Sequence, residues 1–74
     1  MENIKTKAYI INLKYGIWEN QLWLEAQDTP AMQLAFEKAK NGLTKVAENS
    51  QNSSDFFTKA IEHFASFGFD RIQK

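Results

Sequence analysis

The stretch KAYIINLKYGIWENQLWLEAQD, residues 7–28, decides the fold because it holds two alternating runs on either side of a glycine. The first run has the period of two of a half-buried strand, and its apolar set is Tyr9, Ile11, Leu13 and Tyr15. In the second run, Leu22, Leu24 and Ala26 alternate with Trp23 and Glu25. Because Glu25 is costly to bury unpaired, the leucines are predicted to point inward and Trp23 outward.

A hairpin turn is predicted within residues 15–20, where Gly16 and Asn20 lie. Directly paired residues share a face, so pairing the two apolar sets requires residue numbers that sum to an odd value. A two-residue loop at Gly16-Ile17 meets this requirement and places Ile10 opposite Trp23 on the outer face. A register two residues away also meets it and stays open.

The stretch DTPAMQLAFEKAKNGLTKVAEN, residues 28–49, predicts a helix that is capped by Asp28 or Thr29 and has Pro30 in its first turn. Its apolar stripe recurs at spacings of three and four and comprises Met32, Ala35, Phe36, Ala39, Leu43 and Val46. Gly42 interrupts the stripe. It either sits in the helix as a weak point or marks an early end that is followed by another turn.

The polar run ENSQNSS, residues 48–54, predicts a loop, and Ser53 or Ser54 is expected to cap a second helix. The apolar stripe of that helix comprises Phe57, Ala60, Ile61, Phe64 and Phe67. Asp55 complements the helix N-terminus, and Gly68 is expected to end the helix, with Phe69 folding back.

The last residues, FDRIQK, are expected to form a short closing strand. The predicted order is therefore β-β-α-α-β. It gives a single α+β domain over residues 1–74, with a small antiparallel sheet and two helices on one of its faces.

Composition excludes several classes of protein. The 74 residues contain no Cys, so disulfides and thiolate metal sites are excluded, and a small core or a partner chain must supply stability. The start, MENIKTKAYI, lacks the apolar run of a secretory signal, and no run is long enough to span a membrane. We therefore expect a soluble, cytoplasmic protein.

No catalytic, metal or cofactor motif is evident, and the expectation is a protein that is not an enzyme and binds no cofactor. His63 is the only histidine, which makes a zinc site unexpected, and its neighbour Glu62 diverges from it on a helix. Three of the four serines fall in the polar loop, where caps and turns explain them. His63 is interpreted as an ordinary polar residue on a helix flank.

The tryptophans mark the candidate functional surface. An outward Trp23 either covers the sheet or anchors an interface, where Trp and Tyr are enriched, unless two helices straddle the sheet and bury it. The hypothetical partner-binding residues are Trp18, Trp23, Glu19, Glu25, Ile10 and Tyr15. We expect a protein partner, and a two-fold homodimer that buries the apolar spot against its own copy.

Nucleic-acid binding is the alternative. Nine Lys and Arg balance nine Asp and Glu, and this zero net charge argues mildly against it. The lysines that would contact phosphates are Lys5, Lys7, Lys14, Lys38, Lys40 and Lys45. The segment LWLEAQDTPAMQLAFEKAK, about a quarter of the chain, resembles the strand, cap and helix unit of many small α+β proteins, HicB-type antitoxins among them. That resemblance brings no site residues with it, and the alternative function is a small, antitoxin-like nucleic-acid-binding regulator.

The leading interpretation is a non-enzymatic protein-binding module. It would act as an inhibitor or regulator of the kind that phages and mobile elements encode, by binding a basic protein surface.

Overall fold

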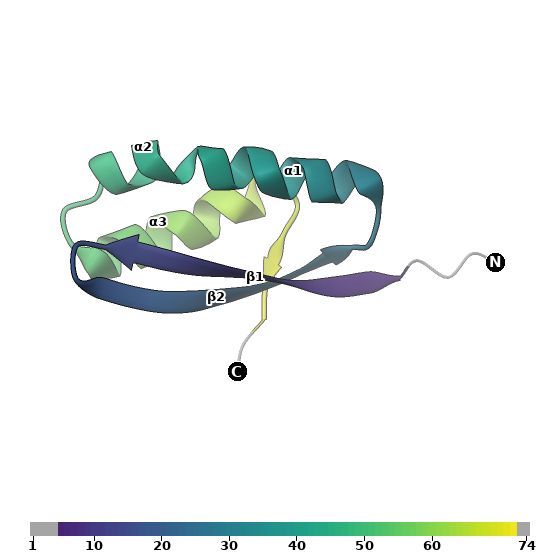
Figure 1. Cartoon of the computed structure of the whole chain (residues 1–74), viewed down its shortest axis with the longest axis horizontal. Helices are drawn as coiled ribbons and strands as arrows, with labels where there is room; N and C mark the ends of the chain where they lie inside the picture. Colours follow the sequence, from purple (N-terminus) through teal and green to yellow (C-terminus); the bar gives the residue numbers. More distant parts are fainter. Residues whose placement is uncertain (1–4, 73–74) are drawn as a thin grey trace.

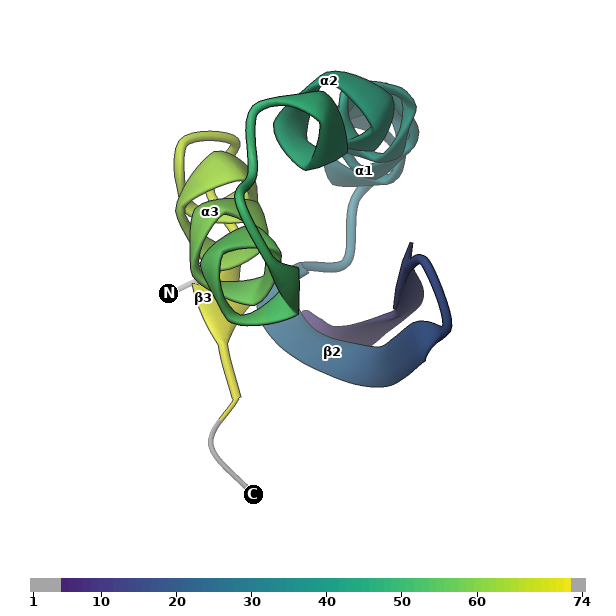
Figure 2. The same ribbon diagram turned by 90° about the vertical axis from the view of Figure 1, so that its left-hand side faces the viewer.

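A computed structural model describes residues 5–72 of the chain as an antiparallel sheet covered on one face by helices (Figures 1 and 2). The elements in chain order are β1 (Thr6–Tyr15), β2 (Trp18–Gln27), α1 (Pro30–Asn41), α2 (Leu43–Glu48), α3 (Ser53–Ala65) and β3 (Asp70–Arg71). The strand order is β1-β2-β3, so the long hairpin supplies two strands and the short return strand joins the far side of β2. The predicted α+β architecture is confirmed.

The hairpin has the predicted register. Ile10 lies opposite Trp23, and the loop consists of Gly16 and Ile17. Gly16 has a φ of 63° while Ile17 has no positive φ, the pattern of a type II′ turn, which takes glycine at its first central position. The alternative register two residues away is therefore excluded.

The inner faces of both strands form one half of the core. On β1 the buried residues are Tyr9, Ile11 and Leu13, and on β2 they are Leu22, Leu24 and Ala26. These are the residues that the alternation predicted. Tyr15, at the end of β1, shares this face and is half-buried.

The sequence predicted Asp28 or Thr29 as the cap of the first helix, and the cap of α1 is Thr29. Thr29 accepts a hydrogen bond from the Met32 N–H at 3.2 Å, and Pro30 occupies the first helical position. Helix α1 ends at Asn41, and α2 starts at Leu43, with only Gly42 between them. Gly42 therefore marks an end of α1 that is followed directly by a further short helix.

His63 explains why glycine stands at this break. Its Nε2 lies 2.9 Å from the carbonyl oxygen of Ala39, near the end of α1. A Cβ on Gly42 would lie only 2.9 Å from the same Nε2. The glycine therefore gives the imidazole room to reach the Ala39 carbonyl, which also accepts from the Gly42 N–H at 3.1 Å.

The cap predicted for the last helix was wrong. Neither Ser53 nor Ser54 caps α3; Asn52 does so, and its Oδ1 accepts from the Asp55 N–H at 2.8 Å. Asparagine is at least as good a cap as serine. A cap at Asn52 also places Asp55 at the third helical position, from which its Oδ2 accepts from the Gln51 N–H at 3.0 Å.

The α3 stripe is wider than predicted. Phe56, which the predicted stripe left out, is only 2% exposed, and it forms a buried ridge with Ala60 and Phe64. Phe57, Ile61 and Phe67 are partly buried beside that ridge. The helix packs against both the sheet and the α1–α2 layer, so it buries a broader arc than one stripe.

The end of α3 is as predicted. The Phe69 N–H bonds to the Phe64 carbonyl at 3.1 Å and the Gly68 N–H to the Ala65 carbonyl at 3.0 Å, the two bonds of a Schellman motif. Gly68 has a φ of 95°, and Phe69 folds back into the core with 1% exposure. This reversal directs the chain into β3.

Aromatic rings fill the space between sheet and helices in two groups. The group under α1 comprises Tyr9, Phe36, Phe64 and Phe69, which make five ring contacts with centroid distances of 5.1–6.0 Å. The group near the hairpin turn comprises Tyr15, Trp18, Phe56 and Phe57. Burial raises the pKa of the Tyr9 phenol, which donates to the Gln27 carbonyl at 2.9 Å.

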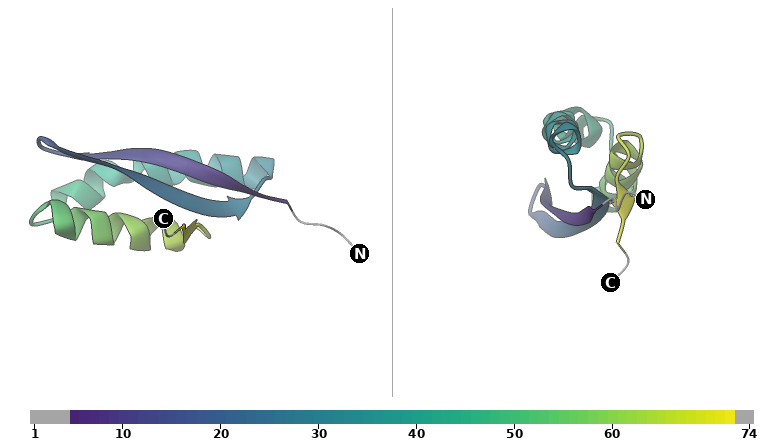
Figure 3. Two further views of the ribbon diagram at one scale, coloured as in Figure 1. Left: turned by 90° about the horizontal axis from the view of Figure 1, so that it is seen from below. Right: turned by 90° about the vertical axis from the view of Figure 1, so that its right-hand side faces the viewer.

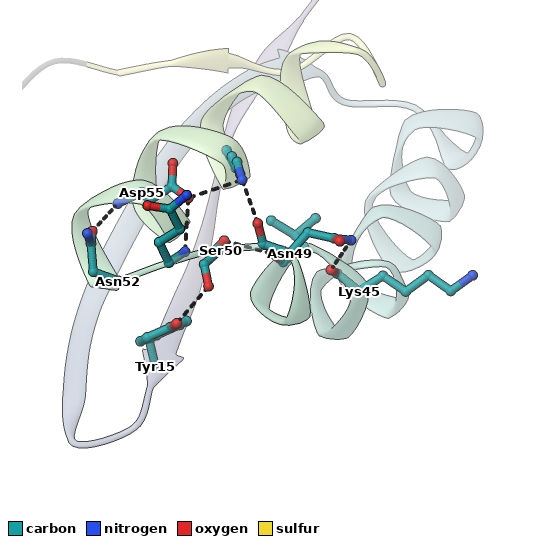
Figure 4. Close-up of polar contacts among 9 residues, drawn as sticks. Tyr15, Lys45, Asn49, Ser50, Asn52 and Asp55 are labelled. Atoms are coloured by element: carbon teal, nitrogen blue, oxygen red, sulfur yellow. Dashed lines mark hydrogen bonds and ion pairs between the residues drawn. The ribbon is translucent and has the colours of Figure 1, made fainter.

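The polar loop between α2 and α3 is held by many hydrogen bonds (Figure 4). The Tyr15 hydroxyl donates to the Ser50 carbonyl at 2.9 Å, which ties the loop to β1. Lys59 Nζ donates to the Asn49 carbonyl at 2.6 Å and also pairs with Asp55 at 3.0 Å. Composition predicted a loop here but not these bonds.

Asp55 makes the stability of the fold sensitive to acid. The Gln51 N–H and then the Lys59 ammonium lower the pKa of this carboxyl below its ordinary value. A lowered pKa in the folded state means that the ionised carboxylate stabilises the fold at neutral pH, and that this contribution disappears as pH falls through the folded pKa. The relevant window begins near the unfolded value, about pH 4, and extends below it.

We therefore expect Asp55→Asn to lower the melting temperature at pH 7, and expect the difference from the wild type to shrink below about pH 4. Thermal melts from pH 7 to pH 3 measure this. In Lys59→Met the bond from Gln51 is kept, so part of the acid sensitivity should persist. If the melting temperatures of Asp55→Asn and the wild type differed by the same amount from pH 7 to pH 3, the lowered pKa of Asp55 would be contradicted.

Candidate protein-binding surface

The sheet face opposite the helices, here called the open face, carries an apolar row of Ile10, Trp23 and Ile72. Ile10 and Trp23 are directly opposite each other, and the Ile72 N–H donates to the Trp23 carbonyl at 2.9 Å. Because Arg71 lies opposite Leu24 on the inner face, alternation puts Ile72 on the open face beside Trp23. Ile10 is 45% exposed, while Trp23 and Ile72 are half-buried.

Viewed from below, the twisted hairpin lies in front of α1, and α3 lies beside the hairpin (Figure 3, left). No helix within residues 5–72 covers the open face, because α1, α2 and α3 all lie on the other side of the sheet. The predicted position of Trp23, outward and next to Ile10, is confirmed. The two helices do not straddle the sheet.

Acidic side chains lie on both sides of this row, along the direction of the strands. Glu25 and Asp70 are directly opposite each other on β2 and β3, and both are exposed. The Thr6 hydroxyl donates to Glu25 at 3.2 Å. Toward the turn, Glu19 pairs with Lys14 at 3.5 Å across the hairpin, which offsets its charge. The acidic end of the open face is therefore the Glu25–Asp70 end.

Two of the six hypothetical partner-binding residues lie on the other face. Trp18 packs edge-on against Phe56 and Phe57, with ring centroids 6.3 and 5.9 Å away. Tyr15 lies 5.6 Å from the Phe56 ring and bonds to the loop before α3. Trp18 and Trp23 differ by an odd number of positions in one strand, so alternation places them on opposite faces.

The structure also adds residues to the surface that the sequence did not single out. Asp70 and Ile72 join it because β3 pairs with β2, and their membership depended on an unpredicted register. Trp23 and Ile72 border a depression of about 300 Å³ between β2 and α3, together with Gln21, Phe57 and Arg71. The Arg71 guanidinium lies 5.0 Å from the Phe57 ring centroid. This depression is large enough to receive a side chain from a partner.

The lysines of the nucleic-acid alternative do not form one patch. Lys14 is on the open face in its pair with Glu19, while Lys7 lies 5.0 Å from the centroid of the inward Tyr9 ring. Lys40 lies over Phe36 and pairs with Glu37 at 3.4 Å. The remaining three are exposed, one before β1 and two in the helical layer: Lys5, Lys38 and Lys45. Phosphate contacts along one strand of nucleic acid would need these charges on a common surface.

His63 occupies a structural position. Besides its contact with Ala39, its ring packs 5.1 Å from the Phe67 ring and 5.8 Å from the Phe64 ring. In the described part of the chain, His, Asp and Glu side chains do not gather in groups of three that could hold a metal ion.

Comparison of the chain with protein-family models, with curated proteins and with solved structures finds no match. None of the helices in residues 5–72 has both the length and the apolar character to cross a membrane.

Proposed function

We propose that this chain is a non-enzymatic protein-binding module whose open face docks onto a basic protein surface. The observation that carries the proposal is the position of Trp23 in an apolar row, on the sheet face opposite α1, α2 and α3, beside the carboxylates of Glu25 and Asp70. Tryptophan is enriched at the centres of interfaces because its large ring gains much from desolvation.

Charge supports the choice of partner. The carboxylates of Glu25 and Asp70 would face Lys and Arg side chains of the partner, which speeds encounter and fixes orientation. The apolar row would supply most of the affinity, because surface ion pairs contribute little. A protein groove built for nucleic acid has this chemistry, so we propose an inhibitor or regulator of the kind that phages or mobile elements encode, acting in the cytoplasm. We also propose that it is a homodimer, because a core this small gains from a second copy.

Capture of the partner tests the proposal. Tagged wild-type protein and a tagged Trp23→Ala variant are incubated with host lysate, each with and without nuclease, and bound proteins are identified by mass spectrometry. We expect a protein with a basic surface that the wild type retains after nuclease treatment and the variant does not. Binding that disappears with nuclease, and weakens linearly in log salt, would instead show a nucleic-acid-binding regulator.

A further inference from the structure

The outer edge of β1 has no strand beside it within residues 5–72, since β1 is the first strand of the sheet. The Asp28 N–H bonds to the Lys5 carbonyl at 2.9 Å, and this fixes which residues of β1 bond to β2. Hydrogen-bonded pairs alternate along an antiparallel ladder. The main-chain N–H and C=O groups of the odd-numbered residues of β1 therefore point to β2. The main-chain groups that point to the outer edge belong to Thr6, Ala8, Ile10, Asn12 and Lys14.

We infer that this edge pairs antiparallel with the same edge of a second copy, with Ile10 opposite Ile10, so that two sheets join into one six-stranded sheet. The inference rests on the self-association proposed above, but not on the partner protein.

The composition of the outer edge of β1 favours pairing with another strand. The segment from Ala8 to Leu13 contains no charged residue and no proline, and it is rich in residues that favour strands. A long, apolar and unpaired edge is a template for uncontrolled pairing with other chains. A closed two-fold pairing satisfies the edge and ends the growth of the sheet.

The register follows from the symmetry of the edge. Its five outward residues are centred on Ile10, so a two-fold axis at Ile10 pairs all of them and gives about ten main-chain hydrogen bonds. Asn12 then lies opposite Ala8 of the second copy, and Lys14 lies opposite Thr6. Any shift of the axis along the strand leaves some of these groups unpaired.

The positions of the two lysines of β1 are compatible with this register. Lys14 of one copy comes beside Thr6 of the other, whose hydroxyl holds the Glu25 carboxylate at 3.2 Å. On the inner face, Lys7 of one copy comes beside Leu13 of the other, where a groove of about 380 Å³ is lined in part by Glu48. Each lysine of the strand therefore approaches a carboxylate, and no lysine lies opposite a lysine.

The helical layer leaves the edge accessible. Between β1 and α1 lies a groove of about 300 Å³, lined by Ala8 and Ile10 on one side and by Gln33 and Glu37 on the other. The pairing would also bring the two Ile10 side chains together on the open face. The row of Ile10, Trp23 and Ile72 would then continue into the row of the second copy and double the apolar area offered to a partner.

Molar mass and hydrogen exchange of the wild-type protein test the inference together. We expect light scattering to give about twice the 8.6 kDa of the chain. We also expect the N–H groups of Ala8, Ile10 and Asn12 to exchange slowly with deuterium in the dimer, and faster on dilution to the monomer. In a monomer these N–H groups face solvent.

A proline variant tests the edge directly. Asn12→Pro removes an N–H that points away from β2, so the hairpin keeps its own ladder. Because of the two-fold symmetry, this one substitution removes two hydrogen bonds at the interface. We expect the dissociation constant of the dimer to rise by about tenfold or more. Asn12→Thr is the matched control because it keeps the N–H, and it should leave the dimer unchanged.

The outcomes are distinguishable. A monomer at millimolar concentration would overturn both the homodimer and the edge pairing. A dimer in which Ala8, Ile10 and Asn12 exchange rapidly, and which Asn12→Pro does not weaken, would keep self-association but overturn the edge pairing. Neither result would bear on whether Trp23 binds a partner protein.

Discussion

Replacing Phe64 by Ala is expected to lower the free energy of unfolding by about 3–5 kcal/mol. The Phe64 ring is fully buried and lies 5.8 Å from the Phe36 ring and 6.0 Å from the Phe69 ring. It therefore touches both the α1 layer and the chain reversal before β3. Neither of them can move into the cavity that the smaller side chain leaves without breaking other contacts. Stability of a domain is only about 5–15 kcal/mol, so the variant should be largely unfolded under mild denaturing conditions.

Urea titration followed by circular dichroism at one protein concentration measures this effect. Ile17→Ala is the matched control, because Ile17 is 105% exposed at the hairpin turn and its truncation should change stability by less than about 0.5 kcal/mol. Phe64→Leu keeps most of the side-chain volume, so its loss in the free energy of unfolding should lie between those of Phe64→Ala and Ile17→Ala. Equal losses for Phe64→Ala and Ile17→Ala would show that the aromatic cluster is not the centre of the core.

The hairpin could be predicted from the sequence because several independent constraints agree on it. Alternation predicted the inward faces, Gly16 and Asn20 placed the turn within residues 15–20, and parity then left few registers. Trp23 followed from this chain of reasoning as an outward residue next to Ile10. The structure made the last choice between registers, with a two-residue loop whose first residue is Gly16.

Competing local signals were harder to resolve. Asn52, Ser53 and Ser54 are all good caps, and the choice among them depends on which one lets Asp55 reach back to Gln51. Phe56 was missed because a single stripe describes a helix with one packing partner, whereas α3 has two. These outcomes depend on tertiary contacts that no short window of sequence contains.

The candidate surface was predicted in part for the same reason. Segment composition grouped Trp18 with Trp23, but side-chain alternation assigns them to opposite faces of the sheet, and Trp18 packs with Phe56 and Phe57. Asp70 and Ile72 were missed because a two-residue strand has no pattern from which to predict its partner or its register. Proximity along the chain is therefore a poor guide to a shared surface in a strand.

Replacing Trp23 by Ala is expected to weaken binding to the partner protein by about 2 kcal/mol or more, which is a rise of roughly thirtyfold in Kd. The indole lies at the middle of the apolar row, between Ile10 and the depression bordered by Ile72. An interface residue in such a central position is the kind that dominates affinity. The melting temperature should change little, because the ring contributes little to the buried core.

The other tryptophan provides the matched control. Trp18 packs against the Phe56 and Phe57 rings on the inner face, so Trp18→Ala should lower the melting temperature by several degrees and leave the affinity of the folded fraction nearly unchanged. Calorimetric titration with the captured partner and thermal melts on the same two variants separate the roles. If Trp23→Ala lost stability without a selective loss of binding, both indoles would be structural.

Charge reversals complete this test of the open face. Glu25→Lys should mainly slow association and change its salt dependence, because an exposed carboxylate near the rim acts on encounter more than on the docked complex. Glu19→Lys should do less, because Lys14 already offsets Glu19 at 3.5 Å. Stopped-flow association rates at two salt concentrations measure both variants. The order of the two effects matters most: a larger effect at Glu19 than at Glu25 would place the partner at the turn end of the hairpin, away from Asp70.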